Sequence, residues 1–436
     1  MVRWPGRYQT CNVGSVRALR ILLFVIVCLT GITLLTLFTG PISSGALFLL
    51  RPARGPAIAE EIPATYEPLH TGHVDLETGL YIRENEDLVV PGKPALVLRR
   101  TYLSRYHVSR QFGVGATHNG EEFLIGDSSA FQWVAVVTAT GASVKFKRVS
   151  PGTSYSNALY VHDETPTDWR DSRLGWAGLK WVLRKQNGVV TTYRGCGPNG
   201  DNNCSILESR FPDGDVIHYR RDGAGRLLTM DDGGRRWIRF EYDPNNRIRR
   251  AYASTGREVR YEYDGRGRMA QATASDGAVR RYRYTDLDEL ATIDEPGTSI
   301  ENAYENGRCI RQVNRYPDAE PYTFTFTYVV ENDAIVRTHT KRSDGTWTEY
   351  TWGPNRYATR EVWGSEGYDP AVFTYERDPV TKAVTALTLT CPDRLGKPLH
   401  HSSLVAPGRE EWLKWDLTRT YCSWNTRGRN QTSIPR

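Results

Sequence analysis

The fold is decided by the stretch Tyr263-Asp264-Gly265-Arg266-Gly267-Arg268-Met269, because its pattern recurs along the chain. Close copies occupy residues 221–227 and 242–248, and weaker ones begin at Tyr284, Tyr304, Tyr328, Trp352 and Tyr375. Successive starts are separated by 21, 21, 21, 20, 24, 24 and 23 residues. Such a period is typical of a repeat architecture, in which each unit buries its apolar face against its neighbours.

A second turn signal falls midway through most repeats, as in Asp276-Gly277. Asp-Gly predicts a hairpin with a type I′ turn, in which both central residues have positive φ. Between the turns, segments such as residues 236–242 alternate bulky side chains with Arg or Glu, as strands do. The sequence therefore predicts an all-β, antiparallel repeat sheet. We expect its turns to be formed by the motif residues Gly225, Tyr242, Asp243, Tyr263, Asp264, Gly267 and Gly277.

The charges of the repeats predict a solvated face and no nucleic-acid partner. Residues 206–283 carry 17 basic and 12 acidic side chains, which we expect to form cross-strand ion pairs. The net charge of +6 arises in residues 1–59, which hold six arginines and no acid, so residues 60–436 are neutral. A basic footprint of the kind that binds phosphates is absent there.

Residues 18–39 predict a single transmembrane helix. They contain one charge, Arg20, and a helix of about 22 residues is about 33 Å long, enough for a hydrocarbon core of about 30 Å. Arginines concentrated before the span place the N-terminus in the cytoplasm, so the body would be periplasmic or extracellular. The alternative is a signal peptide cleaved after Ala59, because residues 57–59 are Ala-Ile-Ala. Both interpretations export the body.

The chain is divided by these signals into six parts. They are a cytoplasmic tail (1–17), the transmembrane helix (18–39), a linker (40–69), an N-terminal β domain (70–205), the repeat sheet (206–390) and a C-terminal capping segment (391–436). In an oxidising compartment, Cys196 and Cys204 could close the turn-rich loop between them as a disulfide.

At the repeat motifs the chain resembles the Rhs/YD-repeat family, known from bacterial polymorphic toxins and from teneurins. A second block resembles the domain that precedes the repeats in bacterial Rhs proteins. It comprises residues 74–79 (VDLETG), 86–92 (EDLVVPG), 96–102 (LVLRRTY) and 112–118 (FGVGATH). The resemblance covers roughly residues 70–380 and implies a β-shell built from the repeats.

The resemblance does not include the features of an Rhs toxin. Rhs toxins release a C-terminal toxin after cleavage at a D-P-x-G motif, which this chain lacks, and only 46 residues follow Thr390. Eight repeats supply roughly 1,800 Å² of sheet, whereas a shell around a domain of about 100 residues needs roughly 5,000 Å². We therefore expect an open or partly closed sheet without enclosed cargo.

No catalytic, P-loop or dinucleotide motif occurs in the sequence, which favours a non-enzymatic protein without cofactor or metal. The densest aromatic group before the repeats could stack on sugar rings if exposed, or form packed core. Its members are Trp133, Trp169, Trp176 and Trp181. The leading hypothesis is a membrane-anchored module that binds an unknown protein or glycan. The alternative, which rests on the family resemblance, is a remnant or accessory component of a polymorphic toxin system.

Overall fold

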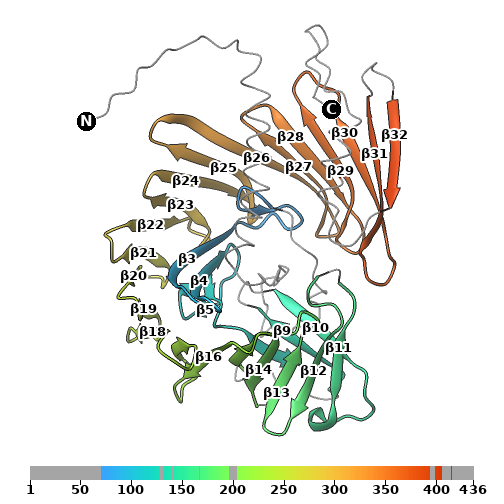
Figure 1. The fold of residues 1–436 in the computed structure, drawn as a ribbon. Coiled ribbons are helices and arrows are strands. Elements are labelled where there is room, and N and C mark those ends of the chain that lie inside the picture. Colours follow the sequence, from blue (N-terminus) through green and yellow to red (C-terminus); the bar gives the residue numbers. More distant parts are fainter. Residues whose placement is uncertain are drawn as a thin grey trace, which may run out of the picture. The chain divides into compact units, whose positions relative to one another are not determined.

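The computed structural model describes residues 70–127, 131–138, 142–165, 167–195, 204–392 and 398–404, together with Lys414. All of these residues belong to one compact unit, residues 44–436. The fold is all-β, as the alternating sequence predicts (Figure 1). Three small sheets form the N-terminal part of the described chain. They are β1 (His70–Thr71) paired with β2 (Val74–Asp75), a sheet of β3 (Ile82–Val90), β4 (Leu96–Leu103) and β7 (Ala116–His118), and β5 (Ser109–Arg110) paired with β6 (Gly113–Val114).

The remaining strands form one sheet in which each strand from β8 onward pairs antiparallel with the next. Its first part comprises β8 (Phe123–Gly126), β9 (Trp133–Val137), β10 (Ser143–Arg148), β11 (Leu159–His162), β12 (Ser172–Ala177), β13 (Lys180–Arg184), β14 (Val190–Arg194) and β15 (Ile206–Arg210). A 3-10 turn, η1 (Tyr155–Asn157), precedes β11. The sheet closes on itself at β8, where Phe123 bridges Ser205 and the Leu124 N–H donates to the carbonyl of Cys204.

The repeats continue this sheet with two strands each. They are β16 (Val216–Arg221), β17 (Leu227–Asp231), β18 (Trp237–Tyr242), β19 (Ile248–Ala253), β20 (Glu258–Tyr263), β21 (Met269–Ala274), β22 (Val279–Tyr284), β23 (Leu290–Glu295), β24 (Thr298–Glu305), β25 (Arg308–Tyr316), β26 (Ala319–Glu331), β27 (Ala334–Arg342), β28 (Thr346–Trp352), β29 (Ala358–Ser365), β30 (Ala371–Arg377), β31 (Val384–Pro392) and β32 (Pro398–Leu404). The hairpin predicted for each repeat is present.

The turn type, however, differs from the prediction. At the midway turn, Gly277 has φ +86°, whereas Asp276 stays outside the positive-φ region, so the turn cannot be type I′. The Gly277 N–H donates to the carbonyl of Ala274, and the Ala274 N–H donates to the carbonyl of Ala278. This pattern is a type I turn followed by a glycine bulge, which requires one left-handed residue instead of two. The Tyr-Asp turns have the same form, with Gly225 and Gly267 in the left-handed position.

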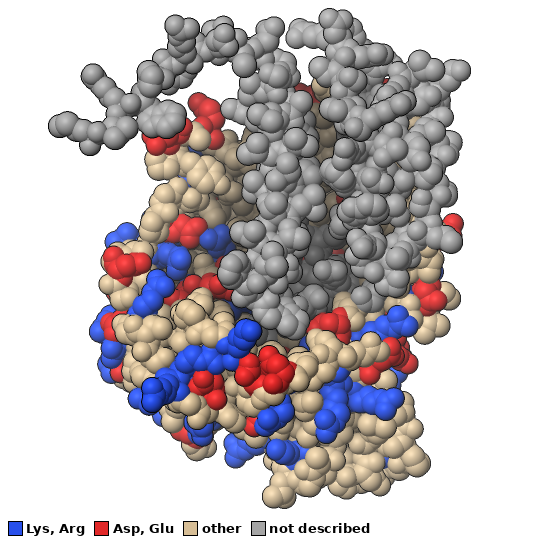
Figure 2. Space-filling view, viewed as in Figure 1, with Lys and Arg blue, Asp and Glu red and all other residues tan. Residues whose placement is uncertain are grey.

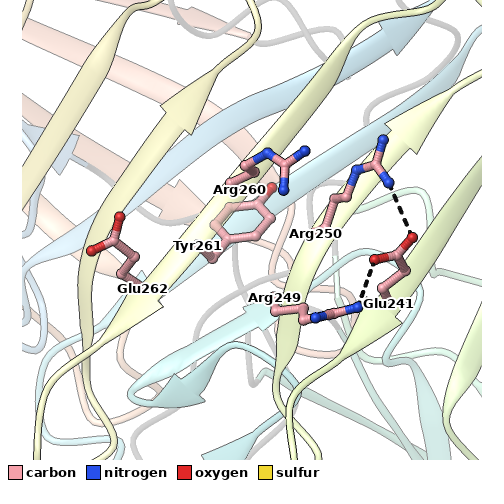
Figure 3. Close-up of a pocket in the computed structure, with 6 residues that line it drawn as sticks. All are labelled: Glu241, Arg249, Arg250, Arg260, Tyr261 and Glu262. Carbon is pink, nitrogen blue, oxygen red and sulfur yellow. Dashed lines mark hydrogen bonds and ion pairs between the residues drawn. The ribbon is translucent and has the colours of Figure 1, made fainter.

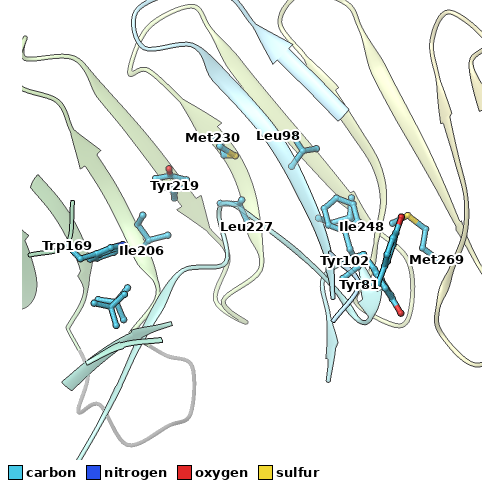
Figure 4. Close-up of a cluster of buried hydrophobic side chains, with 14 of the residues drawn as sticks. Tyr81, Leu98, Tyr102, Trp169, Ile206, Tyr219, Leu227, Met230, Ile248 and Met269 are labelled. Carbon is cyan, nitrogen blue, oxygen red and sulfur yellow. The ribbon is translucent and has the colours of Figure 1, made fainter. Parts of the chain in front are cut away.

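The core joins the N-terminal strands to the repeats. Leu98 of β4 and Tyr81 lie in one buried cluster with Leu227, Ile248 and Met269 of the repeats (Figure 4). Alternate side chains of the earlier repeat strands enter this cluster, as Val259 and Tyr261 do on β20, whereas Phe373 of β30 and Leu387 of β31 belong to a separate cluster. We call this side the inner face and the opposite side, which carries Arg250 and Arg260, the outer face.

Across the residues that the structure describes, no helix is both long and apolar enough to cross a bilayer. The predicted span at residues 18–39 lies outside the described residues, so it stays a prediction.

Candidate interaction surface on the repeat sheet

The repeat tyrosines tie each hairpin to the one before it. The hydroxyl of Tyr263 donates to the carbonyl of Ile248 at 2.6 Å, a residue 15 positions earlier. Tyr242 and Tyr284 make the same bond to Leu227 and Met269, at 2.7 and 2.9 Å. Because these hydroxyls are buried against the preceding turn, each needs such a partner. The tyrosine of the motif therefore fixes the spacing between repeats.

The Asp and Arg of the motif hold the turn itself. The guanidinium of Arg268 donates to Asp264 at 2.7 Å, and the backbone N–H groups of Arg266 and Arg268 donate to the same carboxylate. Burial alone raises the pKa of Asp264, but these hydrogen bonds outweigh it and hold the pKa below its ordinary value. Arg268 also lies 4.8 Å from the ring centre of Tyr284 in the next repeat. The motif residues are thus structural.

The inner face of the repeats is filled by residues 74–118 of the chain itself, which we call the N-terminal segment. Asp87 and Arg100 form a fully buried ion pair at 2.8 Å. The hydroxyl of Tyr261 donates to Asp87 at 2.9 Å, and Arg100 donates to the hydroxyl of Tyr282 at 2.9 Å. Both acid and base come from segments that resemble the Rhs N-terminal block. Their role in docking onto the repeats cannot be read from those segments alone.

Further contacts extend this interface along the sheet. Val114 donates its N–H to the carbonyl of Gly267, and Leu290 donates its N–H to the hydroxyl of Tyr102. Arg236 reaches back to the carbonyls of Lys93 and Pro94 at 2.8 and 2.7 Å. The N-terminal segment therefore occupies the face that would otherwise be open to a ligand.

The outer face carries intermingled basic and acidic side chains, which Figure 2 shows over the repeat strands. An open hollow lies there, lined by residues of β18, β19 and β20 (Figure 3). Its lining residues are Glu241, Arg249, Arg250, Arg260 and Glu262, together with Tyr261, whose side chain is buried on the inner face.

Charge in the hollow is partly neutralised across strands. Glu241 accepts from Arg249 at 3.2 Å and from Arg250 at 3.1 Å. Arg250 and Arg260 both pair with Glu258. The side chains of Arg249 and Arg260 are nevertheless 62% and 63% exposed, so their guanidinium groups remain accessible to solvent.

Partly exposed rings lie beside these charges on the outer face. Trp237 and Tyr252 pack edge to face with centres 5.6 Å apart, and the guanidinium of Arg239 lies 4.2 Å from the centre of Trp237. Arginine with aromatic rings is the composition that interface centres favour.

The predicted stacking tryptophans divide into two pairs. Trp169 and Trp181 are 1% and 0% exposed, so they are core residues and cannot stack on an external ligand. The reason is local packing within the part of the sheet that precedes the repeats, where Trp181 packs against Tyr160 and Trp176. Trp176 and Trp133 are half-buried, the latter beneath the ammonium of Lys145.

Cys204 is buried and disulfide-bonded. Its predicted partner, Cys196, lies outside the described residues, so that pairing stays a prediction.

The adjacent acids Asp231 and Asp232 bind different arginines, Arg220 and Arg236. Among the residues that the structure describes, no group of three His, Cys, Asp or Glu side chains could hold a metal ion.

Two family models match the chain. Residues 242–279 match the RHS Repeat, and residues 71–146 match a domain of unknown function, DUF6531. Together with the hairpin array, these matches define the class as an all-β repeat protein. The chain is, more narrowly, an Rhs/YD-repeat protein. No curated protein matches the sequence significantly.

Solved toxin complexes resemble the chain at low sequence identity. A TcdB2-TccC3 structure is 10% identical with a TM-score of 0.34, over 75% of this chain and 23% of that one. A Tc holotoxin pore from Photorhabdus luminescens is 9% identical with a TM-score of 0.27, over 77% of this chain and 21% of that one. The chain thus spans less than a quarter of the length of either structure.

Proposed function

We propose that the chain is a membrane-anchored, non-enzymatic YD-repeat protein whose exported body acts as a binding or surface-interaction module. The observation that carries the proposal is the filling of the inner face by the chain's own residues 74–118. A partner of the repeats would then meet the outer face, where Arg249 and Arg260 extend into solvent beside Glu241. Guanidinium groups and half-buried rings suit an acidic protein surface or a glycan.

A crosslinking pull-down with the purified body tests the binding role. Replacing Arg249 and Arg260 by Gln should weaken capture of the partner about fivefold, the change that corresponds to about 1 kcal/mol. Arg283→Gln is the matched control, because Arg283 is 64% exposed and also forms a surface ion pair. Equal capture by both variants would show that the hollow is not the binding surface.

The membrane anchor has its own test. A reporter enzyme that is active only outside the cytoplasm should work when fused after Arg436. Activity restricted to the cytoplasmic side would overturn the proposed orientation. Hydrolysis of glycans or peptides by the purified body at an ordinary enzymatic rate would overturn the non-enzymatic proposal.

The RHS Repeat match favours a second candidate, an accessory or remnant component of a polymorphic toxin system. Neighbouring genes for a toxin, an immunity protein or a secretion component would support it. Their absence from several genomes would count against it.

A further inference from the structure

A buried carboxylate on the later repeats accepts hydrogen bonds from three neutral donors. Glu361 of β29 is 2% exposed. Its Oε1 accepts from the hydroxyl of Tyr350 and the indole N–H of Trp363, both at 2.6 Å, and its Oε2 accepts from the hydroxyl of Tyr375. These donors lie on β28, β29 and β30, which are neighbouring strands of the sheet.

The pattern of the strands explains why these groups meet. Tyr350 is the register partner of Glu361 across β28 and β29, and Trp363 stands two residues further along the same side of β29. Trp363 and Tyr375 also pack against a hydrophobic cluster that contains Phe373 and Leu387. The sheet alone therefore orients the carboxylate and places two aromatic rings beside it.

One further group enters this arrangement from a distant part of the chain. The Nζ of Lys414 donates to Oε2 of Glu361 at 3.0 Å, across 53 residues of sequence, and the lysine is 3% exposed. Its ammonium lies 5.7 Å from the ring centre of Trp363 and 5.9 Å from that of Tyr375. A carboxylate with aromatic faces around a cation is the chemistry that recognises an ammonium group.

Electrostatics agrees with this geometry. Burial alone would raise the pKa of Glu361, but the Lys414 ammonium and the three hydrogen bonds outweigh it and keep the pKa below its ordinary value. An ion pair this deeply buried contributes little net stability, because desolvation of both charges offsets their attraction. The pair therefore adds more to the geometric specificity of the site than to the net stability of the fold.

We propose that Glu361, Tyr350, Trp363 and Tyr375 form a binding site for the primary ammonium of a lysine side chain, which Lys414 occupies within the chain. The site is distinct from the outer-face hollow and does not depend on the proposed function. A lysine-bearing segment of another polypeptide would have to displace Lys414 to bind there.

Chemical rescue tests the site. In the full chain, Lys414→Ala should lower the melting temperature, and n-butylammonium should restore it in a saturable manner. The recovery should be about 2–4 °C at about ten times the dissociation constant. N-butylguanidinium should restore less, because the planar group is wider than an ammonium.

Two controls make the outcome decisive. Lys341→Ala removes an exposed lysine paired with Glu366, so n-butylammonium should have no specific effect on that variant. Adding Glu361→Gln to Lys414→Ala should abolish the rescue. Equal response of Lys414→Ala and Lys341→Ala, or equal rescue by the guanidinium compound, would overturn the proposal.

A second measurement covers the case in which Lys414→Ala does not fold. In the unmutated chain, acetic anhydride should label Lys414 at least about tenfold more slowly than Lys341, whose side chain is 55% exposed. Glu361→Gln should remove most of that protection. Labelling of the two lysines at the same rate in the unmutated chain would overturn the proposal.

Discussion

Single residues in the turns dictate the geometry of the repeats. Gly277 has φ +86° and its missing Cβ would face open space, so a substitution there is penalised by backbone strain alone. We expect Gly277→Val to lower the free energy of unfolding by about 1–3 kcal/mol. Denaturant unfolding measures it. Gly265→Ala is the control, because Gly265 is equally open but lies outside the positive-φ region. A loss no larger than the control would contradict the turn assignment.

Asp75 is the residue from which we expect a pH response. It accepts from the N–H and hydroxyl of Thr78, and burial raises its pKa to about 6 from an ordinary value of 3.8. Between these values the folded chain holds a proton that the unfolded chain has released. Binding of this proton stabilises the folded chain by about 3 kcal/mol in all. The stabilisation is fully present below pH about 4 and is lost as the pH rises through 6.

Unfolding titrations from pH 4 to 7 check this prediction. Asp75→Asn should remove that part of the pH dependence while keeping an oxygen for Thr78. Asp286→Asn, which removes a carboxylate at an exposed turn, is the control for the loss of one negative charge. If the Asp75 variant has the same profile as the unmutated chain, the carboxyl does not titrate in this range.

At the scale of elements, each hairpin depends on a hydroxyl from the next. Tyr263→Phe removes the bond to the carbonyl of Ile248 and should cost about 1–2 kcal/mol, because that acceptor loses its tyrosine partner. Thermal unfolding measures the effect. Tyr316 is 45% exposed, so Tyr316→Phe should change stability by less than about 0.5 kcal/mol. Equal effects would show that the tyrosine bond does not link the repeats.

The hairpins could be predicted because the signals that form them are local. Gly267 and Gly277 mark turns by their own conformational freedom, and alternation marks the strands between them. The predicted type I′ turn is wrong, because Asp-Gly also suits a type I turn with a bulge when the glycine takes the final position. The burial of Trp169 and Trp181 does not follow from the sequence, because strand alternation does not tell which face is covered.

At the scale of the molecule, the N-terminal segment and the repeats share one core. Asp87→Ala should destabilise the protein by about 3–5 kcal/mol, because it leaves Arg100 charged and unpaired in that core. Glu86→Ala is a closely matched control, because the neighbouring Glu86–Arg99 pair is exposed and should contribute less than about 1 kcal/mol. Calorimetry compares the two. Similar losses would mean that the buried pair does not hold the segment in place.

This shared core could not be predicted, because its contacts join residues far apart in sequence. Thr338 donates to the carbonyl of Leu76 across 262 positions, and Arg356 pairs with Glu77 across 279. The sequence around each residue contains no local pattern that predicts its partner. Lys414 and Glu361 are 53 positions apart, which is also too far for a local pattern to predict their pairing.

The sequence separation between Glu77 and Arg356 also sets a delay between the synthesis of the two residues. A ribosome adds about 5–20 residues per second, so Glu77 emerges roughly 14–56 s before the arginine that will neutralise it. During that interval the nascent N-terminal segment is covered only by those repeats that have already emerged. Its apolar side chains, Leu98 among them, would be available to a chaperone until the later strands arrive. The residues around Glu77 are thus made before the repeats but reach their native surroundings only after Arg356 has emerged.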